Sequence, residues 1–482
     1  MVKKSLKKVA LNGVLWSVVD KFAIQGGQLL IGIVLARLLM PEDFGLIGML
    51  SIFLAISLSF VDSGMGSGLI QKKNATSLDF STVFIFNFLV SVFFYFVLYF
   101  AAPFIAVFYE TPQLVLLTRV LSLNIIINSL AIVQRSKLTI VIDFKTIAKV
   151  NLVSVFLGGL IAVYCAYIGF GVWSLVIQVM VSSLTSVIMF WLLGNWKPSI
   201  AFSKKSFKEL FGFGSKLLLA SVYSKLLTNI YNIVIGKAYS STELGYYTRA
   251  KSFAEIASGT VGSVLQQVTY PLLASIQDNE TRMVSVYKRV IGMTAFFIFP
   301  VMTLFALLAD PLVKLVLTDK WIPIIGLLQL MCFARIVKPI SFVNMNILNA
   351  IGRSDLFLKV DLSKLPIIIL TLVITIPLGI KAMVIGHVCT SITSFFINAY
   401  MPGKLFGYGA LNQLKDMVPV IISTFVMAFS VYISVYFLDN LYLKIILGVL
   451  VGSITYLFMS YVFKAEELKE IKQLLLKVRT KK

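Results

Sequence analysis

Long apolar stretches separated by short polar breaks run along almost the whole chain. A helix that crosses the hydrocarbon core of a bilayer needs about 20 predominantly apolar residues, and most of the stretches reach that length. The pattern predicts an all-α membrane protein with about fourteen spans, at 10–39, 44–70, 80–108, 113–134, 147–168, 172–193, 210–238, 245–273, 287–317, 322–350, 363–378, 382–400, 417–438 and 441–463. The span 245–273 is polar and rich in small residues, so we expect it to face protein or a cavity.

The composition supports a membrane protein and excludes several other classes. Of the 482 residues, 59% are hydrophobic and 13% are charged, and the mean hydropathy is +0.93. Soluble domains are about 45–50% apolar and about 25% charged. Cys165, Cys332 and Cys389 are scattered over apolar runs and His387 is the only histidine, so neither a disulfide framework nor a metal centre is expected. We therefore expect no cofactor, no metal and no catalytic residues.

The net charge of +22 is explained by topology rather than by binding to nucleic acid. When the N-terminus is placed in the cytoplasm, 29 of the 43 Lys and Arg residues fall in segments on the cytoplasmic side. Only 6 fall on the opposite side, and 8 lie within the spans. Because cytoplasmic loops carry the excess of Lys and Arg, this asymmetry predicts that both termini are cytoplasmic.

Two segments recur in the second half of the chain and indicate an internal repeat. The sequence ARLLMPEDFG at 36–45 corresponds to GKAYSSTELG at 236–245, and AAPFIAVF at 101–108 corresponds to ADPLVKLV at 309–316. Homologous halves of this kind build the central site of many transporters. The predicted domains are a six-helix lobe at 1–195, a cytoplasmic linker helix at 196–209, a second six-helix lobe at 210–402, two additional spans within 403–463 and a cytoplasmic amphipathic tail at 464–482.

Four segments carry a family resemblance: ARLLMPEDFGLIGML, VDSGMGSGLIQKK, APFIAVFYETPQL and GFGVWSLVIQ. Through them the chain resembles the Wzx-type exporters of lipopolysaccharide and exopolysaccharide. These exporters belong to the MOP superfamily, together with the MATE drug exporters and the lipid II flippase. The resemblance implies a V-shaped pair of lobes in the bacterial inner membrane that flips polyprenyl-diphosphate-linked oligosaccharide to the outer leaflet. The implied partners are that substrate, membrane lipids, a polysaccharide polymerase and glycosyltransferases.

Charged residues inside the spans are the candidates for transport chemistry, because a charge at the bilayer centre costs about 2.5–3.5 kcal/mol on insertion scales. The cations in the spans are Lys21, Arg119, Lys216, Lys225, Arg249, Lys251, Arg335 and Lys338. The acids in the spans include Asp20, Asp62 and Glu255. A surplus of cations calls for an anionic guest, and Arg and Lys are suitable donors to phosphate oxygens.

We expect three mid-span cations, Lys21, Lys225 and Arg335, to line a central cavity that holds the diphosphate. Three cations nearer the outer side, Arg119, Arg249 and Lys251, are expected to receive it after the conformational switch. For each residue taken alone, an interhelix salt bridge or a side chain that reaches the interface remains the alternative. Asp20, Asp62 and Glu255 are the candidate residues for ion coupling.

Two other functions compete with this hypothesis. A MATE-like exporter of cationic small molecules would favour acids in the cavity, whereas cations outnumber acids in the spans. A membrane enzyme of glycan assembly, such as a polymerase or ligase, usually needs a sizeable loop for its catalytic site, and the predicted loops are short. The phosphate-binding motif GxxxxGK[ST] does not occur in the sequence, so ATP hydrolysis by the chain is not supported.

Overall fold

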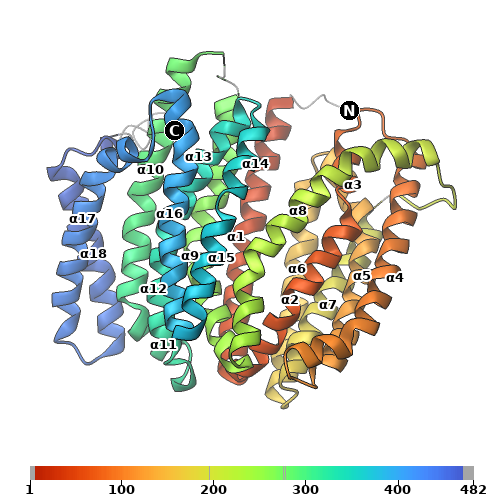
Figure 1. The fold of residues 1–482 in the computed structure, drawn as a ribbon, viewed down its shortest axis with the longest axis horizontal. Helices are drawn as coiled ribbons and strands as arrows, with labels where there is room; N and C mark the ends of the chain where they lie inside the picture. Colours follow the sequence, from red (N-terminus) through yellow and green to blue (C-terminus); the bar gives the residue numbers. More distant parts are fainter. Residues whose placement is uncertain (1–5, 195, 275, 277, 470–482) are drawn as a thin grey trace. The chain divides into compact units, whose positions relative to one another are not determined.

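The chain is folded almost entirely into helices in a computed structural model, which describes residues 6–194, 196–274, 276 and 278–469 (Figure 1). Every regular element of this described part is helical. The elements are α1 (Leu6–Leu38), α2 (Pro41–Asp62), α3 (Met65–Gln71), α4 (Ser77–Phe108), α5 (Leu114–Ile140), α6 (Phe144–Tyr167), α7 (Val172–Leu193), α8 (Lys204–Ala238), α9 (Ser241–Ala274), α10 (Glu280–Leu307), α11 (Ala309–Val316), η1 (Asp319–Trp321), α12 (Ile324–Ile336), α13 (Lys338–Ala350), α14 (Ser354–Leu362), α15 (Leu365–Thr375), η2 (Ile376–Leu378), α16 (Ile380–Phe406), α17 (Ala410–Tyr436) and α18 (Leu441–Val462).

Each of the fourteen ranges expected to span the membrane contains helix, which confirms an all-α, multi-pass membrane protein. Within the described residues, 11 helical segments are long and apolar enough to cross a bilayer. In α1 the apolar helix covers Ile24–Leu38, which is shorter than a span, and α15 has 11 residues. The count of fourteen spans is therefore not confirmed.

Several expected spans consist of two helices joined by a local break. The range 44–70 contains α2 and α3, which are separated by Ser63 and Gly64 with φ angles of 50° and 64°. Ser63 is the C-cap of α2, and Gly64 is the N-cap of α3. Glycine adopts a positive φ at little cost, so Gly64 suits this position. The range 287–317 is likewise divided into α10 and α11.

The contacts divide the chain into two compact units, Met1–Thr248 and Arg249–Lys482. In the first unit, α6 packs against α1 and α7, α4 packs against α5, and α8 packs against α2. In the second unit, α17 and α18 lie side by side, α10 packs against α12 and α17, and α16 packs against α12, α13 and α15 (Figure 1).

The lobe boundaries expected from the sequence, at 1–195, 196–209, 210–402 and 403–463, remain predictions. The structure adds that α8 runs without interruption from Lys204 to Ala238, so residues 204–209 form its first turns. Of the expected amphipathic tail, residues 464–469 are described and residues 470–482 lie outside the described part.

The first sequence repeat coincides with the crossing of α2 and the start of α9, within the first unit. A Cβ atom on Gly45 would lie 1.7 Å from the carbonyl oxygen of Ser241. Reciprocally, a Cβ atom on Gly245 would lie 1.9 Å from the carbonyl oxygen of Pro41. The two contacts are reciprocal: Gly45 meets Ser241, and Gly245 meets Pro41, each residue being replaced by its counterpart 200 positions away. Contacts related by a two-fold axis have this property. The two glycines recur because the backbones at this crossing leave no room for a side chain.

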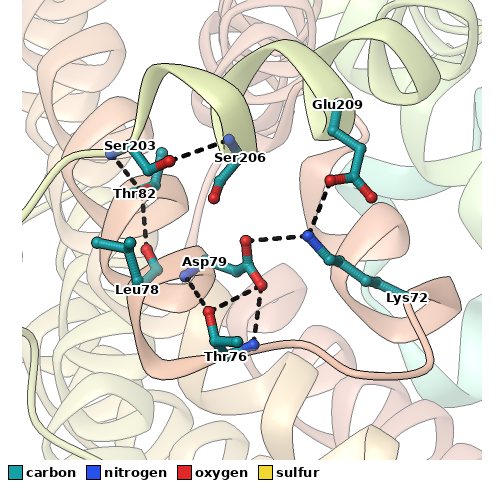
Figure 2. A network of polar contacts seen from close by, with 8 residues as sticks. All are labelled: Lys72, Thr76, Leu78, Asp79, Thr82, Ser203, Ser206 and Glu209. Atoms are coloured by element: carbon teal, nitrogen blue, oxygen red, sulfur yellow. Dashed lines mark hydrogen bonds and ion pairs between the residues drawn. The ribbon is translucent and has the colours of Figure 1, made fainter.

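Figure 2 shows a charged network that ties the loop between α3 and α4 to the start of α8. Lys72 Nζ lies 3.1 Å from Asp79 Oδ1 and 2.9 Å from Glu209 Oε2. Asp79 also accepts hydrogen bonds from the Thr76 backbone N–H, at 2.8 Å, and from the Thr76 hydroxyl, at 3.0 Å. The hydrogen bonds to Glu209 and Asp79 raise the pKa of Lys72, so its ammonium stays protonated at neutral pH.

Substitution of either repeat glycine by alanine should destabilise the protein strongly, because the new methyl group would overlap a backbone carbonyl that cannot move independently. Gly45→Ala and Gly245→Ala are each expected to lower the melting temperature of the detergent-purified protein. Gly212→Ala in α8 is the matched control, since a Cβ there meets nothing within 4 Å. The control should be neutral or more stable, because alanine is favoured over glycine in helices by about 1 kcal/mol. Equal melting temperatures for all three variants would contradict the close crossing.

The two acids of the Lys72 network should differ in importance because only one of them is buried. Asp79 is 2% exposed, and its replacement by alanine leaves buried donors without an acceptor, at a cost of about 1–3 kcal/mol. The Glu209 side chain is 55% exposed, and an exposed ion pair contributes less than about 1 kcal/mol. Thermal unfolding of Asp79→Ala and Glu209→Ala should therefore show the larger loss for Asp79→Ala. The opposite order would mean that the network depends on the exposed pair.

Candidate functional site

The expected span 322–350 is interrupted where α12 ends at Ile336 and α13 begins at Lys338. Pro339 has no backbone N–H, so it cannot donate the helical hydrogen bond to the carbonyl of Arg335, four residues earlier. Arg335 and Lys338 therefore flank a break in a segment that is long and apolar enough to cross the membrane. In secondary transporters, broken helices of this kind form substrate and ion sites.

Arg335 is the centre of a charged cluster in the second unit. It is only 6% exposed, and its guanidinium forms an ion pair with Glu255 of α9, whose side chain is 42% exposed. The charges of Lys251 and Lys338 also act on Glu255. Lys251 and Glu255 interact at the i,i+4 spacing, as the sequence predicted. Three cations act on one acid, so these four residues together carry a net charge of +2.

Part of the hydrogen-bonding capacity of Arg335 is unused by the described protein groups. Its Nε is buried and has no hydrogen-bond partner among the residues that the structure describes. Buried donors are normally paired, so an unpaired guanidinium N–H indicates a place for a ligand oxygen or an ordered water. His387 of α16 is acted on by the charges of Arg335, Lys251 and Lys338 as well, which brings a fourth helix to the cluster.

The other predicted cation on α9, Arg249, lies two residues before Lys251. Positions i and i+2 on a helix do not face each other, so the two side chains leave the helix in different directions. Arg249 is partly buried in the second unit. In the described ranges, no three His, Cys, Asp or Glu side chains are grouped as metal ligands.

The first unit holds two predicted cations that have local partners or neighbours. Lys21 on α1 follows Asp20, whose carboxylate accepts hydrogen bonds of 3.2 and 3.3 Å from the side-chain amide of Asn151 on α6. Arg119 on α5 lies over the ring of Tyr99 on α4, with Cζ 4.3 Å from the ring centroid. This cation–π contact gives Arg119 a structural role that does not need a substrate.

Lys225 and Asp62, the remaining predicted site residues, are both exposed in the described structure. Lys225 lies on α8, and Asp62 is the last residue of α2. The charge of Arg135 acts on both Asp62 and Asp20. Arg135 lies in the last two turns of α5.

Of the predicted site residues, the structure thus brings three together: Arg335, Lys251 and Glu255. Lys21 and Lys225 lie in the first unit and Arg335 in the second, so their expected sharing of one cavity remains a prediction. The sequence pattern assigned no binding role to Lys338 or to His387. The signal that could have identified Lys338 is Pro339 beside it, because a proline in a span predicts a helix break.

Comparison with curated proteins finds relatives named for polysaccharide synthesis and transport. The chain is 24% identical over 407 residues to the teichuronic acid biosynthesis protein TuaB of Bacillus subtilis, covering 83% of this chain and 84% of TuaB. It is 23% identical to the lipopolysaccharide biosynthesis protein WzxC of Escherichia coli, covering 75% and 74%. It is 25% identical to the succinoglycan biosynthesis transport protein ExoT of Rhizobium meliloti, covering 67% and 66%.

Solved structures share the fold at low sequence identity. The lipid II flippase MurJ, in an inward closed conformation, aligns with a TM-score of 0.76 at 16% identity, covering 93% of this chain and 98% of MurJ. An inward-facing multidrug resistance MATE transporter of the MOP superfamily aligns with a TM-score of 0.60 at 16% identity, covering 83% and 96%. These likenesses confirm the expected MATE-like and MurJ-like fold.

A family model described as polysaccharide biosynthesis protein matches residues 34–326, which is more than half of the chain and extends from the end of α1 into α12. The protein belongs to this polysaccharide biosynthesis family.

Proposed function

We propose that the protein flips polyprenyl-diphosphate-linked oligosaccharide repeat units across the bacterial inner membrane by alternating access, for export of a surface polysaccharide. The observation that carries the proposal is the cluster of net charge +2 around Arg335, in a chain of the polysaccharide biosynthesis family. The names of WzxC and ExoT and the MurJ-like fold support it. The excess of Lys and Arg in one set of loops supports cytoplasmic termini.

In this mechanism the diphosphate replaces an internal anion. Glu255 holds the Arg335 guanidinium while the site is empty. An incoming diphosphate offers several anionic oxygens to Arg335, Lys251 and Lys338, and it displaces the single carboxylate of Glu255. Arg is suited to this exchange because its planar guanidinium can donate two parallel hydrogen bonds to one phosphate group.

The remaining predicted residues extend the path of the substrate. Lys21 and Lys225 bind the diphosphate together with Arg335 in the central cavity. Arg119 and Arg249 then receive it nearer the outer side, and Lys251 holds it at both stages. Asp20, Asp62 and Glu255 are the residues through which an ion gradient would act. Glycosyltransferases supply the polyprenyl-diphosphate-linked oligosaccharide on the cytoplasmic side, and a polysaccharide polymerase consumes it on the outer side.

The same observations weigh against the two competing functions. A MATE-like exporter of cations would bring a positive substrate to a cluster that already carries +2, which is repulsive. An enzyme of glycan assembly would act on a substrate held by catalytic groups, and the names of the relatives point to transport instead. We therefore propose a transporter rather than an enzyme.

Neutralising Arg335 should impair export while leaving the protein in the membrane. Hydrogen bonds to charged groups contribute about 1.5–3 kcal/mol, so Arg335→Gln should weaken diphosphate binding roughly 10- to 150-fold. Arg335→Lys should retain part of the function, because it keeps the charge but loses the fork geometry. Surface polysaccharide is measured in a strain that lacks the chromosomal copy, with protein levels matched.

Lys21→Gln and Lys225→Gln belong in the same assay, because they test the predicted central cavity. Lys216→Gln is the control: Lys216 is an exposed lysine of α8 and is assigned no role in binding. Full export by the Arg335→Gln, Lys21→Gln and Lys225→Gln variants would end the assignment of the diphosphate site.

Replacement of Glu255 by Gln tests whether this carboxylate competes with the substrate. Without the acid, the buried Arg335 loses its ion-pair partner, so the empty protein should melt at a lower temperature. Inorganic pyrophosphate should bind more tightly, by roughly 10-fold if the lost competition is worth about 1.4 kcal/mol. Bound pyrophosphate should also restore the melting temperature of the Glu255→Gln variant. A purely structural ion pair would give the lower stability without the tighter binding.

A further inference from the structure

A cleft of about 1070 Å³ opens between α10, α17 and the segment that follows α18, all within the second unit. It is distinct from the Arg335 cluster, with which it shares no lining residue. The cleft lies where α10 begins at Glu280, where α17 begins at Ala410 and where α18 ends at Val462. All three helices are long and apolar enough to span a bilayer, so the cleft lies at the ends of three candidate spans. Headgroups flank the hydrocarbon core of a bilayer, so a cleft at the ends of spans is within their reach.

Basic and acidic side chains line this cleft in equal number. The basic residues are Lys288, Arg289, Lys415 and Lys464, and the acidic residues are Glu280, Asp416, Glu466 and Glu467. Lys415 and Lys464 are exposed lysines of this lining. The apolar residues of the lining are Val284, Pro419, Val420, Phe463 and Ala465. Such a lining suits a guest with both signs of charge and an apolar part.

A buried tyrosine contacts one cation and one acid of the cleft, which lie on two different helices. The Tyr408 hydroxyl donates a 2.8 Å hydrogen bond to Asp416 Oδ2 on α17. The Lys288 ammonium of α10 lies 4.7 Å from the centroid of the same ring. Burial and the hydrogen bond to Asp416 raise the pKa of Tyr408, so its hydroxyl remains a neutral donor.

The tyrosine is itself held by a rigid polar core. Its ring packs edge-on against Tyr287, with centroids 5.7 Å apart. Gln413 Nε2 donates to the Tyr287 hydroxyl at 3.1 Å and to Asn344 Oδ1 at 3.0 Å, which joins α10, α13 and α17 below the cleft. The positions of Lys288 and Asp416 are therefore set before any ligand arrives, which lowers the cost of binding.

We propose that this cleft binds a zwitterionic phospholipid headgroup of the phosphatidylethanolamine type. Lys288 and Lys415 receive the phosphate, and Glu280 and Glu466 receive the ammonium. The phosphate is a charged acceptor for lysine donors, and a primary ammonium offers three N–H donors to carboxylates. Phosphatidylglycerol lacks the ammonium, and the quaternary nitrogen of phosphatidylcholine has no N–H to donate. The balance of charge in the lining thus distinguishes between lipids that share the same phosphate.

The test uses the full-length protein purified in detergent, with added phosphatidylethanolamine, phosphatidylglycerol or phosphatidylcholine. Lipid retention is measured by native mass spectrometry, and melting temperature is measured in parallel. We expect phosphatidylethanolamine to be retained best and to raise the melting temperature most. Equal or better retention of phosphatidylglycerol would overturn the proposal.

Two sets of variants separate the halves of the headgroup. K288A/K415A should weaken retention of phosphatidylethanolamine by about fivefold per lysine, since each basic side chain near a membrane surface contributes about 1 kcal/mol. E280Q/E466Q should reduce retention of phosphatidylethanolamine but not of phosphatidylglycerol. K404A is the matched control, because Lys404 is an exposed lysine near the end of α16 that does not line the cleft. Unchanged lipid selectivity in both double variants would refute the site.

A binding measurement with a soluble compound distinguishes a lipid from a free metabolite that carries the same charges. Glycerophosphoethanolamine carries the headgroup without acyl chains. It should bind at least tenfold more weakly than the lipid, because the apolar part of the lining then stays without a partner. Equal affinity for the soluble compound would show that the cleft recognises a free phosphate ester and would overturn the lipid assignment.

Discussion

Hydrocarbon cannot hydrogen-bond to a peptide group or solvate a charge, and this constraint shapes most of the structure. The backbone satisfies its own polar groups by forming helices, which is why the regular elements of the described chain are all helical. The same constraint acts on the charges within the spans. The buried Arg335 persists because Glu255 neutralises part of its charge, and Lys251 and Lys338 also interact electrostatically with the same acid.

Places where the helical pattern is interrupted carry most of the specific features. At Pro339 a missing N–H breaks the helix and puts Arg335 and Lys338 on either side of the break. At Gly64 a left-handed residue separates α2 from α3. At Gly45 and Gly245 the absence of a side chain lets two backbones approach to a distance that only glycine allows. In each case the residue type explains the local geometry through one steric or hydrogen-bonding property.

The second unit contains two charged sites of different character. The Arg335 cluster has an excess of cations, and the proposed guest is a diphosphate. The cleft between α10 and α17 has as many acids as bases, and the proposed guest is a zwitterion. In both proposals the charge of the guest complements the charge of the residues around it. The two sites therefore need not compete for the same molecule.

The sequence by itself determined the membrane class, the helical ranges, the repeat and the family resemblance. These follow from local properties: the length of apolar runs, the sides on which Lys and Arg fall, and short motifs such as residues 36–45 and 236–245. The i,i+4 interaction of Lys251 and Glu255 was predictable for the same reason, since it depends only on helical periodicity.

Only the tertiary structure decided which distant residues are neighbours. The pairing of Arg335 with Glu255, 80 positions apart, depends on how α9 packs near α12, and no local pattern specifies that. The same holds for Tyr408, whose ring and hydroxyl bring Lys288 and Asp416 into one cleft. A sequence shows that a charge inside the membrane needs a partner, but the partner is chosen by the packing of helices, in which side chains far apart along the chain come into contact.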